Sequence, residues 1–63
     1  MSENPVDEAR RHVRQGENII AAQERLIEQL RIKGAGTEQA ETLLASYRSA
    51  LAEMRGHLAA MTL

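Results

Sequence analysis

Two histidines and the glutamates that precede them are the residues best suited to chemistry in this chain of 63 residues. His12 follows Glu8 by four positions, and His57 follows Glu53 at the same spacing. On an α-helix that spacing places each pair on one face. Imidazoles and carboxylates together can bind zinc or another divalent ion, and a dimer would double the number of ligands.

We nevertheless assign no metal site and no cofactor. The spacing matches neither the Glu-x-x-His motif of di-iron bundles nor the His-Glu-x-x-His motif of zinc peptidases. The favoured interpretation is structural, with His12 and His57 at the boundary of a core and each histidine held by its glutamate. A metal site is one alternative. A pH-sensitive contact is another, because two neighbouring imidazoles repel each other once they are protonated.

The hydroxyl groups and the glycine-rich segment do not form a catalytic motif. Ser46 and Ser49 lie about two to three helical turns from His57, which is too far for direct activation. Residues 34–37, Gly-Ala-Gly-Thr, lack the spacing and the Lys-Ser/Thr end of a phosphate-binding loop. The sequence therefore predicts a protein that is not an enzyme.

Two runs of apolar residues at alternating steps of three and four predict two amphipathic helices. The helices are expected at about 5–33 and 37–62, with a turn at 34–36. Long helices joined by so short a turn must return antiparallel, so we expect a single all-α hairpin domain over 1–63. The apolar positions are Val6, Ala9, Val13, Ile20, Ile27 and Leu30, then Ala40, Leu44, Tyr47, Leu51, Met54, Leu58 and Met61.

Local signals mark the ends of both helices. Asn4 is a good N-cap, and Pro5 suits the first helical position because no amide hydrogen is needed there. Gly34 can adopt the left-handed conformation that ends a helix. Thr37 is the expected N-cap of the second helix.

Small and polar residues interrupt the apolar stripe at two levels. Gly16 falls opposite Met54 and would permit a close approach of the helices there. Gln23 and Tyr47 fall at one level and are expected to hydrogen-bond each other. Such a polar layer can also fix the register of the packed helices.

The two flanks of the predicted hairpin differ in charge. On one flank the residue numbers of three oppositely charged pairs add to a constant total, which predicts ion pairs between the helices. These pairs are Glu17 with Arg55, Glu24 with Arg48, and Arg31 with Glu41. The other flank is largely apolar. The residues expected to face each other there, at the same height along the two helices, are His12 with His57, Ile19 with Ala50, and Leu26 with Leu43.

A hairpin cannot bury this second flank by itself, because the apolar stripe is wider than a two-stranded seam requires. We therefore expect a homodimer that forms a four-helix bundle with coiled-coil packing. The alternative occupant of this flank is a helix of another protein. The expected interface comprises Ile19, Ile20, Gln23, Leu26, Ile27, Leu43, Leu44, Tyr47, Ala50, Leu51 and Met54.

Composition narrows the range of partners. The formal net charge of −1 gives no global attraction to nucleic acid or anionic membranes. Cysteine is absent, so no disulfide is expected. Apolar runs are too short to span a bilayer, so we expect a cytoplasmic protein. The alternative function is binding of nucleic acid by arginines on the outer face of the first helix. Acidic residues interleaved on that face, and the absence there of an aromatic residue to stack on a base, weigh against it. The arginines are Arg10, Arg11, Arg14 and Arg25.

Two resemblances support the hairpin. In length and pattern alone the chain resembles the Rop family of small plasmid regulators, in which helical hairpins dimerise into four-helix bundles. The chain also contains the patterns Arg11-His12-x-x-x-Gly16-Glu17-x-x-Ile20 and Gly34-x-x-Thr37-x-x-Ala40-x-x-Leu43-Leu44. In these patterns it is similar to short bacterial helical-hairpin proteins of uncharacterised function, a similarity that implies a fold and no particular activity.

Overall fold

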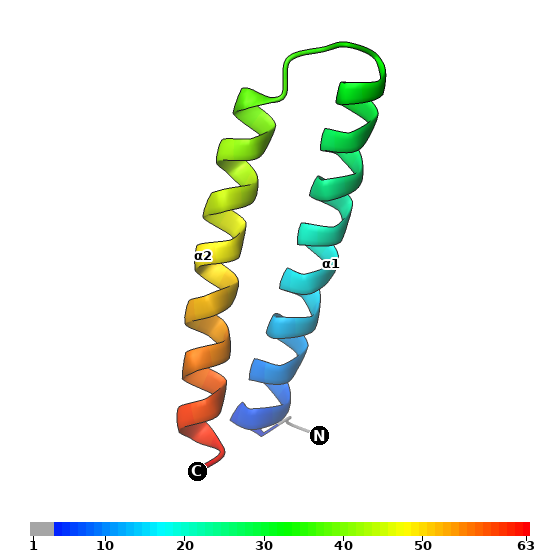
Figure 1. Cartoon of the computed structure of the whole chain (residues 1–63). Coiled ribbons are helices and arrows are strands. Elements are labelled where there is room, and N and C mark those ends of the chain that lie inside the picture. Colours follow the sequence, from blue (N-terminus) through cyan, green and yellow to red (C-terminus); the bar gives the residue numbers. More distant parts are fainter. Residues whose placement is uncertain (1–3) are drawn as a thin grey trace.

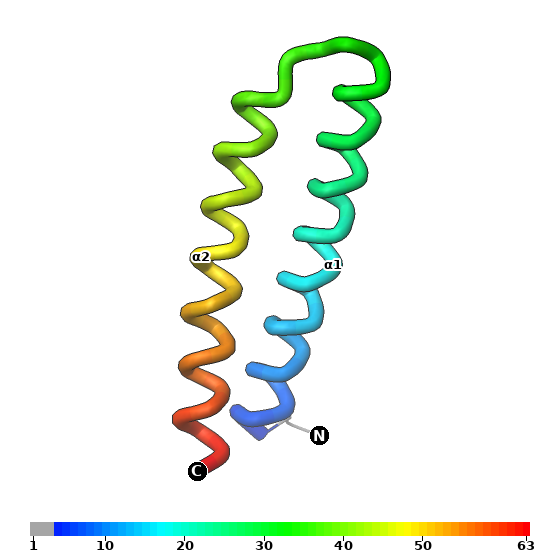
Figure 2. Tube along the Cα trace, viewed as in Figure 1, coloured from blue at the N-terminus to red at the C-terminus, as the bar shows by residue number. Residues whose placement is uncertain are grey.

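The computed structural model describes residues 4–63, which form two helices packed side by side and antiparallel (Figures 1 and 2). The first helix, α1, spans Pro5–Ile32, and the second, α2, spans Glu38–Met61. The all-α class and the packing of two helices on each other are as predicted. The start of α1 is also as predicted, and each of the other three helix ends lies one residue inside its predicted position. The predicted domain includes residues 1–3, which lie outside the described residues.

The start of α1 is fixed by a side-chain cap. The Asp7 amide donates a hydrogen bond of 2.8 Å to Oδ1 of Asn4, and Pro5 follows as the first helical residue. A cap of this kind typically stabilises a helix by about 1 kcal/mol. Asp7 and Glu8 add negative charge to the first turn, where the helix dipole favours it.

The end of α1 is a Schellman motif built on Gly34. This residue has φ +72°, a conformation that is strained for any residue with a Cβ atom. Its amide donates to the Arg31 carbonyl at 3.0 Å, and the Ala35 amide donates to the Leu30 carbonyl at 2.9 Å. The chain therefore reverses within a few residues, as the glycine predicted.

The start of α2 differs from the prediction in its chemistry. Thr37 occupies the N-cap position, but its side chain accepts no hydrogen bond from an amide of α2. Instead its hydroxyl donates to Oε2 of Glu41 at 3.0 Å, and Oε1 of the same carboxylate accepts from Arg31 at 2.8 Å. Glu41 thus connects the first turn of α2 to the last turn of α1.

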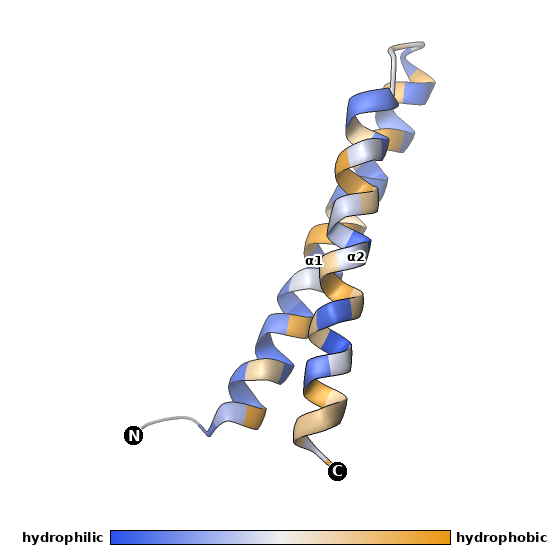
Figure 3. Ribbon diagram, turned by 90° about the vertical axis from the view of Figure 1, so that its left-hand side faces the viewer, coloured by the Kyte–Doolittle hydropathy of each residue, from blue (hydrophilic) through white to orange (hydrophobic). Residues whose placement is uncertain are grey.

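The core is small and the shape is elongated. Among the described residues the buried apolar side chains are Ile27, Leu44 and Leu51, which lie in the seam between the helices. The Cα atoms extend over 47 × 22 × 13 Å, and their radius of gyration is 14.8 Å. A compact domain of this length would have a radius of about 11 Å. Apolar and polar positions alternate along both helices, which cross in the turned view (Figure 3).

Within residues 4–63, neither helix combines the length and the apolar character that crossing a membrane requires.

Candidate dimer interface

One flank of the hairpin is joined by three ion pairs, and we call its residues the charged flank. Arg31 contacts Glu41 at 2.8 Å, Arg48 contacts Glu24 at 2.9 Å and Arg55 contacts Glu17 at 2.9 Å, each through Nη2. All three predicted pairs are confirmed. The side chains are about half exposed, so each pair contributes at most about 1 kcal/mol.

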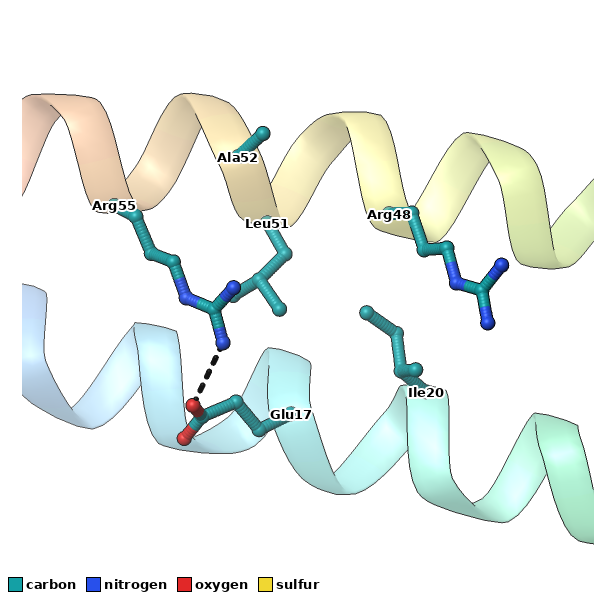
Figure 4. Close-up of a pocket in the computed structure, with 6 residues that line it drawn as sticks. All are labelled: Glu17, Ile20, Arg48, Leu51, Ala52 and Arg55. Carbon is teal, nitrogen blue, oxygen red and sulfur yellow. Dashed lines mark hydrogen bonds and ion pairs between the residues drawn. The ribbon is translucent and has the colours of Figure 1, made fainter.

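The charged flank also covers the seam. In Figure 4 the Arg55 guanidinium reaches across to the Glu17 carboxylate, beside Leu51 of α2. Ile20 of α1 lines the same hollow from the opposite helix. Because the Arg55 stem lies beside the apolar Leu51 while its charged end is paired, the chain's own residues partly cover this side of the seam.

The helices approach each other closely at Gly16. A Cβ atom placed on Gly16 would lie 3.1 Å from Cδ1 of Leu51 and 3.9 Å from Sδ of Met54. The predicted close approach is therefore present, although Leu51 rather than Met54 is the nearer neighbour. The absence of a side chain at Gly16 lets the Leu51 methyl group pack directly on the α1 backbone.

The polar layer of the seam differs from the prediction. Gln23 is buried, but its Nε2 donates to the backbone carbonyl of Ala40 at 2.9 Å rather than to Tyr47. The expected hydrogen bond between Gln23 and Tyr47 is therefore wrong. A backbone acceptor in the first turn of α2 lies within reach because the glutamine side chain extends along the seam toward the turn.

The opposite flank has no such cover. Ile19 is 49% exposed, and Leu26 and Leu43 are each 44% exposed. Ala50, which is also exposed, completes the set, and we call these four residues the apolar face. Exposed leucine and isoleucine side chains gathered on one side of two adjacent helices are the surface that a protein partner would cover.

A second feature of this side was not found by the sequence analysis. Five positions that border the apolar face, one heptad place further from the seam, are also uncharged and exposed, while Glu8 and Glu53 occupy the same heptad place toward the open end. The five positions are Gln15, Ala22, Gln29, Gln39 and Ser46. The signal was present in the heptad pattern, and it extends the uncharged surface beside Ile19, Leu26 and Leu43, whereas Glu53 lies beside Ala50. Depletion of charge is typical of the centre of protein interfaces.

The residues predicted for a dimer interface thus fall into two groups. Gln23, Ile27, Leu44 and Leu51 are buried within the single hairpin, while Ile20 and Tyr47 are half-buried. Met54 is 36% exposed. The apolar face accounts for the remaining predicted residues, and it is the part that a single chain leaves open.

The histidines lie at the open end, by which we mean the end opposite the turn. His12 and His57 line one shallow hollow together with Pro5, Glu8, Ala9 and Met61. Glu53 lines a different hollow, with Ser46 and Ser49. Among residues 4–63 there is no hydrogen bond or ion pair between either histidine and the glutamate four residues before it, and no group of three or more side chains placed to hold a metal ion.

The four arginines of the alternative nucleic-acid surface are exposed on α1. Arg10 lies 4.0 Å from the Asp7 carboxylate, so part of its charge is balanced locally. The sole aromatic residue of the chain, Tyr47, lies on the other helix and is half-buried, so it does not offer this patch a ring on which a base could stack.

Comparison with models of protein families, with curated proteins and with solved structures finds no match to this chain. The assignment of a function therefore depends on the geometry of the hairpin itself.

Proposed function

We propose that two copies of this hairpin dock through their apolar faces into a four-helix bundle, and that the chain is a non-enzymatic interaction or regulatory module. The observation that carries this proposal is the asymmetry of the flanks. The charged flank is spanned by the chain's own ion pairs, while the apolar face exposes Ile19, Leu26 and Leu43.

The exposed surface area supports an interface of standard size. The described structure exposes 4915 Å². A compact monomer of this chain length would expose about 4,000 Å². The excess of about 900 Å² is close to the roughly 800 Å² per partner that a standard protein interface buries.

The small core favours a second copy over an unrelated helix. Three buried apolar residues supply too little burial to offset the entropy of ordering two long helices, and small domains of this kind are usually stabilised by oligomerisation. In a symmetric dimer the same patch of both subunits meets, so the patch must complement itself. An apolar face can do so because apolar side chains pack on one another.

The test is the mass of the untagged protein in sedimentation equilibrium, with helix content followed by circular dichroism at the same concentrations. We expect a species of twice the chain mass that loses helix as it dissociates on dilution. A helical monomer at all concentrations would contradict the dimer and leave the apolar face to another protein.

A matched pair of variants locates the interface. Leu26→Glu places a carboxylate in the apolar face and is expected to raise the dissociation constant by more than about tenfold, which corresponds to about 1.4 kcal/mol. Arg25→Glu changes the net charge by more but lies on the outer side of α1, and it should leave the dimer intact. If both variants dissociate the dimer equally, the assignment of the interface is wrong.

A further inference from the structure

We infer that the two copies dock with their turns at the same end of the bundle. This inference depends on the proposed dimer and adds the orientation of its subunits. It follows from the side chains on the flank opposite the charged flank, which we call the uncovered side. These side chains are apolar near the turn and include two histidines at the open end.

Three layers succeed one another along the uncovered side. Leu26 and Leu43 form the layer nearest the turn, Ile19 and Ala50 form the next, and the layer of His12 and His57 lies at the open end. The first two layers are apolar, and the third contains the two imidazoles. The charged flank fixes this order, because its confirmed ion pairs set which residues of α1 and α2 lie at one level.

The charged flank already joins α1 to α2 within one chain, so the uncovered side of each helix must meet a helix of the partner. With the turns at the same end, α1 of one copy lies against α2 of the other. Each layer then meets its equivalent, so that leucines pack on leucines and isoleucine packs on alanine. The imidazoles meet imidazoles at the open end, where water can still reach their polar atoms.

With the turns at opposite ends, full overlap would set the histidine layer of each copy against the leucine layer of the other. Imidazole nitrogens covered by leucine would lose water without gaining a hydrogen-bond partner, which typically costs about 1–3 kcal/mol for each group. This cost would arise at four histidines in the dimer.

Sliding the copies by one heptad would restore apolar pairing in the opposite-end arrangement. It would also set His12 near Lys33 at the turn of the partner and leave about 10 Å of each open end outside the bundle. The same-end arrangement keeps the whole length of both hairpins in contact and avoids both penalties.

Distances between spin labels test the orientation, because the native chain has no cysteine and single cysteines can be labelled cleanly. Gly36→Cys places a label in the turn, where a Cβ atom would meet no other atom within 4 Å and φ is not positive. Thr62→Cys places a label at the open end, at an exposed residue. Ser49→Cys, halfway along the outer side of α2, is the control for dimer formation in either orientation.

In the same-end arrangement we expect both end labels to give short distances of about 20–30 Å, because neighbouring helices lie about 8–10 Å apart. Opposite ends would separate each pair by nearly the length of the hairpin, 47 Å. Long distances at 36 and 62 alongside a dipolar signal at 49 would overturn the same-end orientation and leave the dimer standing. No dipolar signal at any of the three positions would overturn the dimer and the orientation together.

Discussion

The charged flank and the uncovered flank are made by the same two helices, and they differ in what completes them. On the charged flank each arginine finds a glutamate of the other helix at 2.8–2.9 Å. On the uncovered flank the equivalent positions carry Ile19, Leu26 and Leu43, whose apolar groups can be removed from water only by another molecule. The difference teaches that the ion pairs join the helices within one chain in a single register, while the apolar residues outside the seam have no cover from the chain itself.

The largest expected effect comes from breaking the seam that both flanks share. Leu51 is 5% exposed and packs against Gly16, so Leu51→Ala should lower the free energy of unfolding by about 2–5 kcal/mol. Urea denaturation monitored by circular dichroism measures the loss.

Leu43→Ala is the matched control, because it removes the same atoms from a side chain that the single hairpin leaves 44% exposed. Its cost should approach that of Leu51→Ala if a second copy covers Leu43, because folding and dimer formation are then coupled, and it should be much smaller if the hairpin folds as a monomer. A cost of Leu43→Ala well below that of Leu51→Ala at every concentration would mean that Leu43 is not part of an intermolecular surface.

A smaller effect is expected from the two glycines inside the helices. Gly56→Ala meets no atom within 4 Å and should stabilise the protein by about 1 kcal/mol through helix propensity. Gly16→Ala should gain less or lose stability, because its Cβ would lie 3.1 Å from a methyl group of the buried Leu51. Thermal melts of both variants provide the comparison. An equal gain at the two positions would show that the seam is looser than the close contact at Gly16 implies.

The smallest effect is expected on the charged flank. A double-mutant cycle with Glu24→Ala and Arg48→Ala should give a coupling energy of about 0.2–1 kcal/mol, since the pair is about half exposed. The coupling should fall further in high salt because screening weakens exposed ion pairs. A coupling well above 1 kcal/mol that resists salt would mean that this flank contributes stability and not only register.

Much of the fold could be predicted because each element depends on local chemistry. The spacing of apolar residues determines the helices, and the ends of α1 follow from Asn4 and Gly34. The ion pairs followed from one assumption, that the helices return at a fixed offset, and all three tested that assumption at once.

The errors occur where side chains choose among several partners. Gln23 bonds to the Ala40 carbonyl, and Thr37 bonds to Glu41 instead of capping its helix. A heptad pattern describes which faces meet, but it does not describe how far a flexible polar side chain reaches along the seam. The homodimer and its interface remain predictions, because the same exposed leucines would suit another protein's helix.

The nesting of the ion pairs around the turn has a consequence for how the hairpin folds. The paired residues are separated by 10 positions for Arg31 and Glu41, by 24 for the middle pair and by 38 for the pair nearest the open end. Once the ion pair nearest the turn has formed, each further pair closes only a short additional loop. The entropy cost of loop closure is therefore divided into small steps. Folding should therefore proceed from the turn, and fraying should begin at the opposite end, so the amide hydrogens of the histidine layer should exchange with water before those of the two apolar layers.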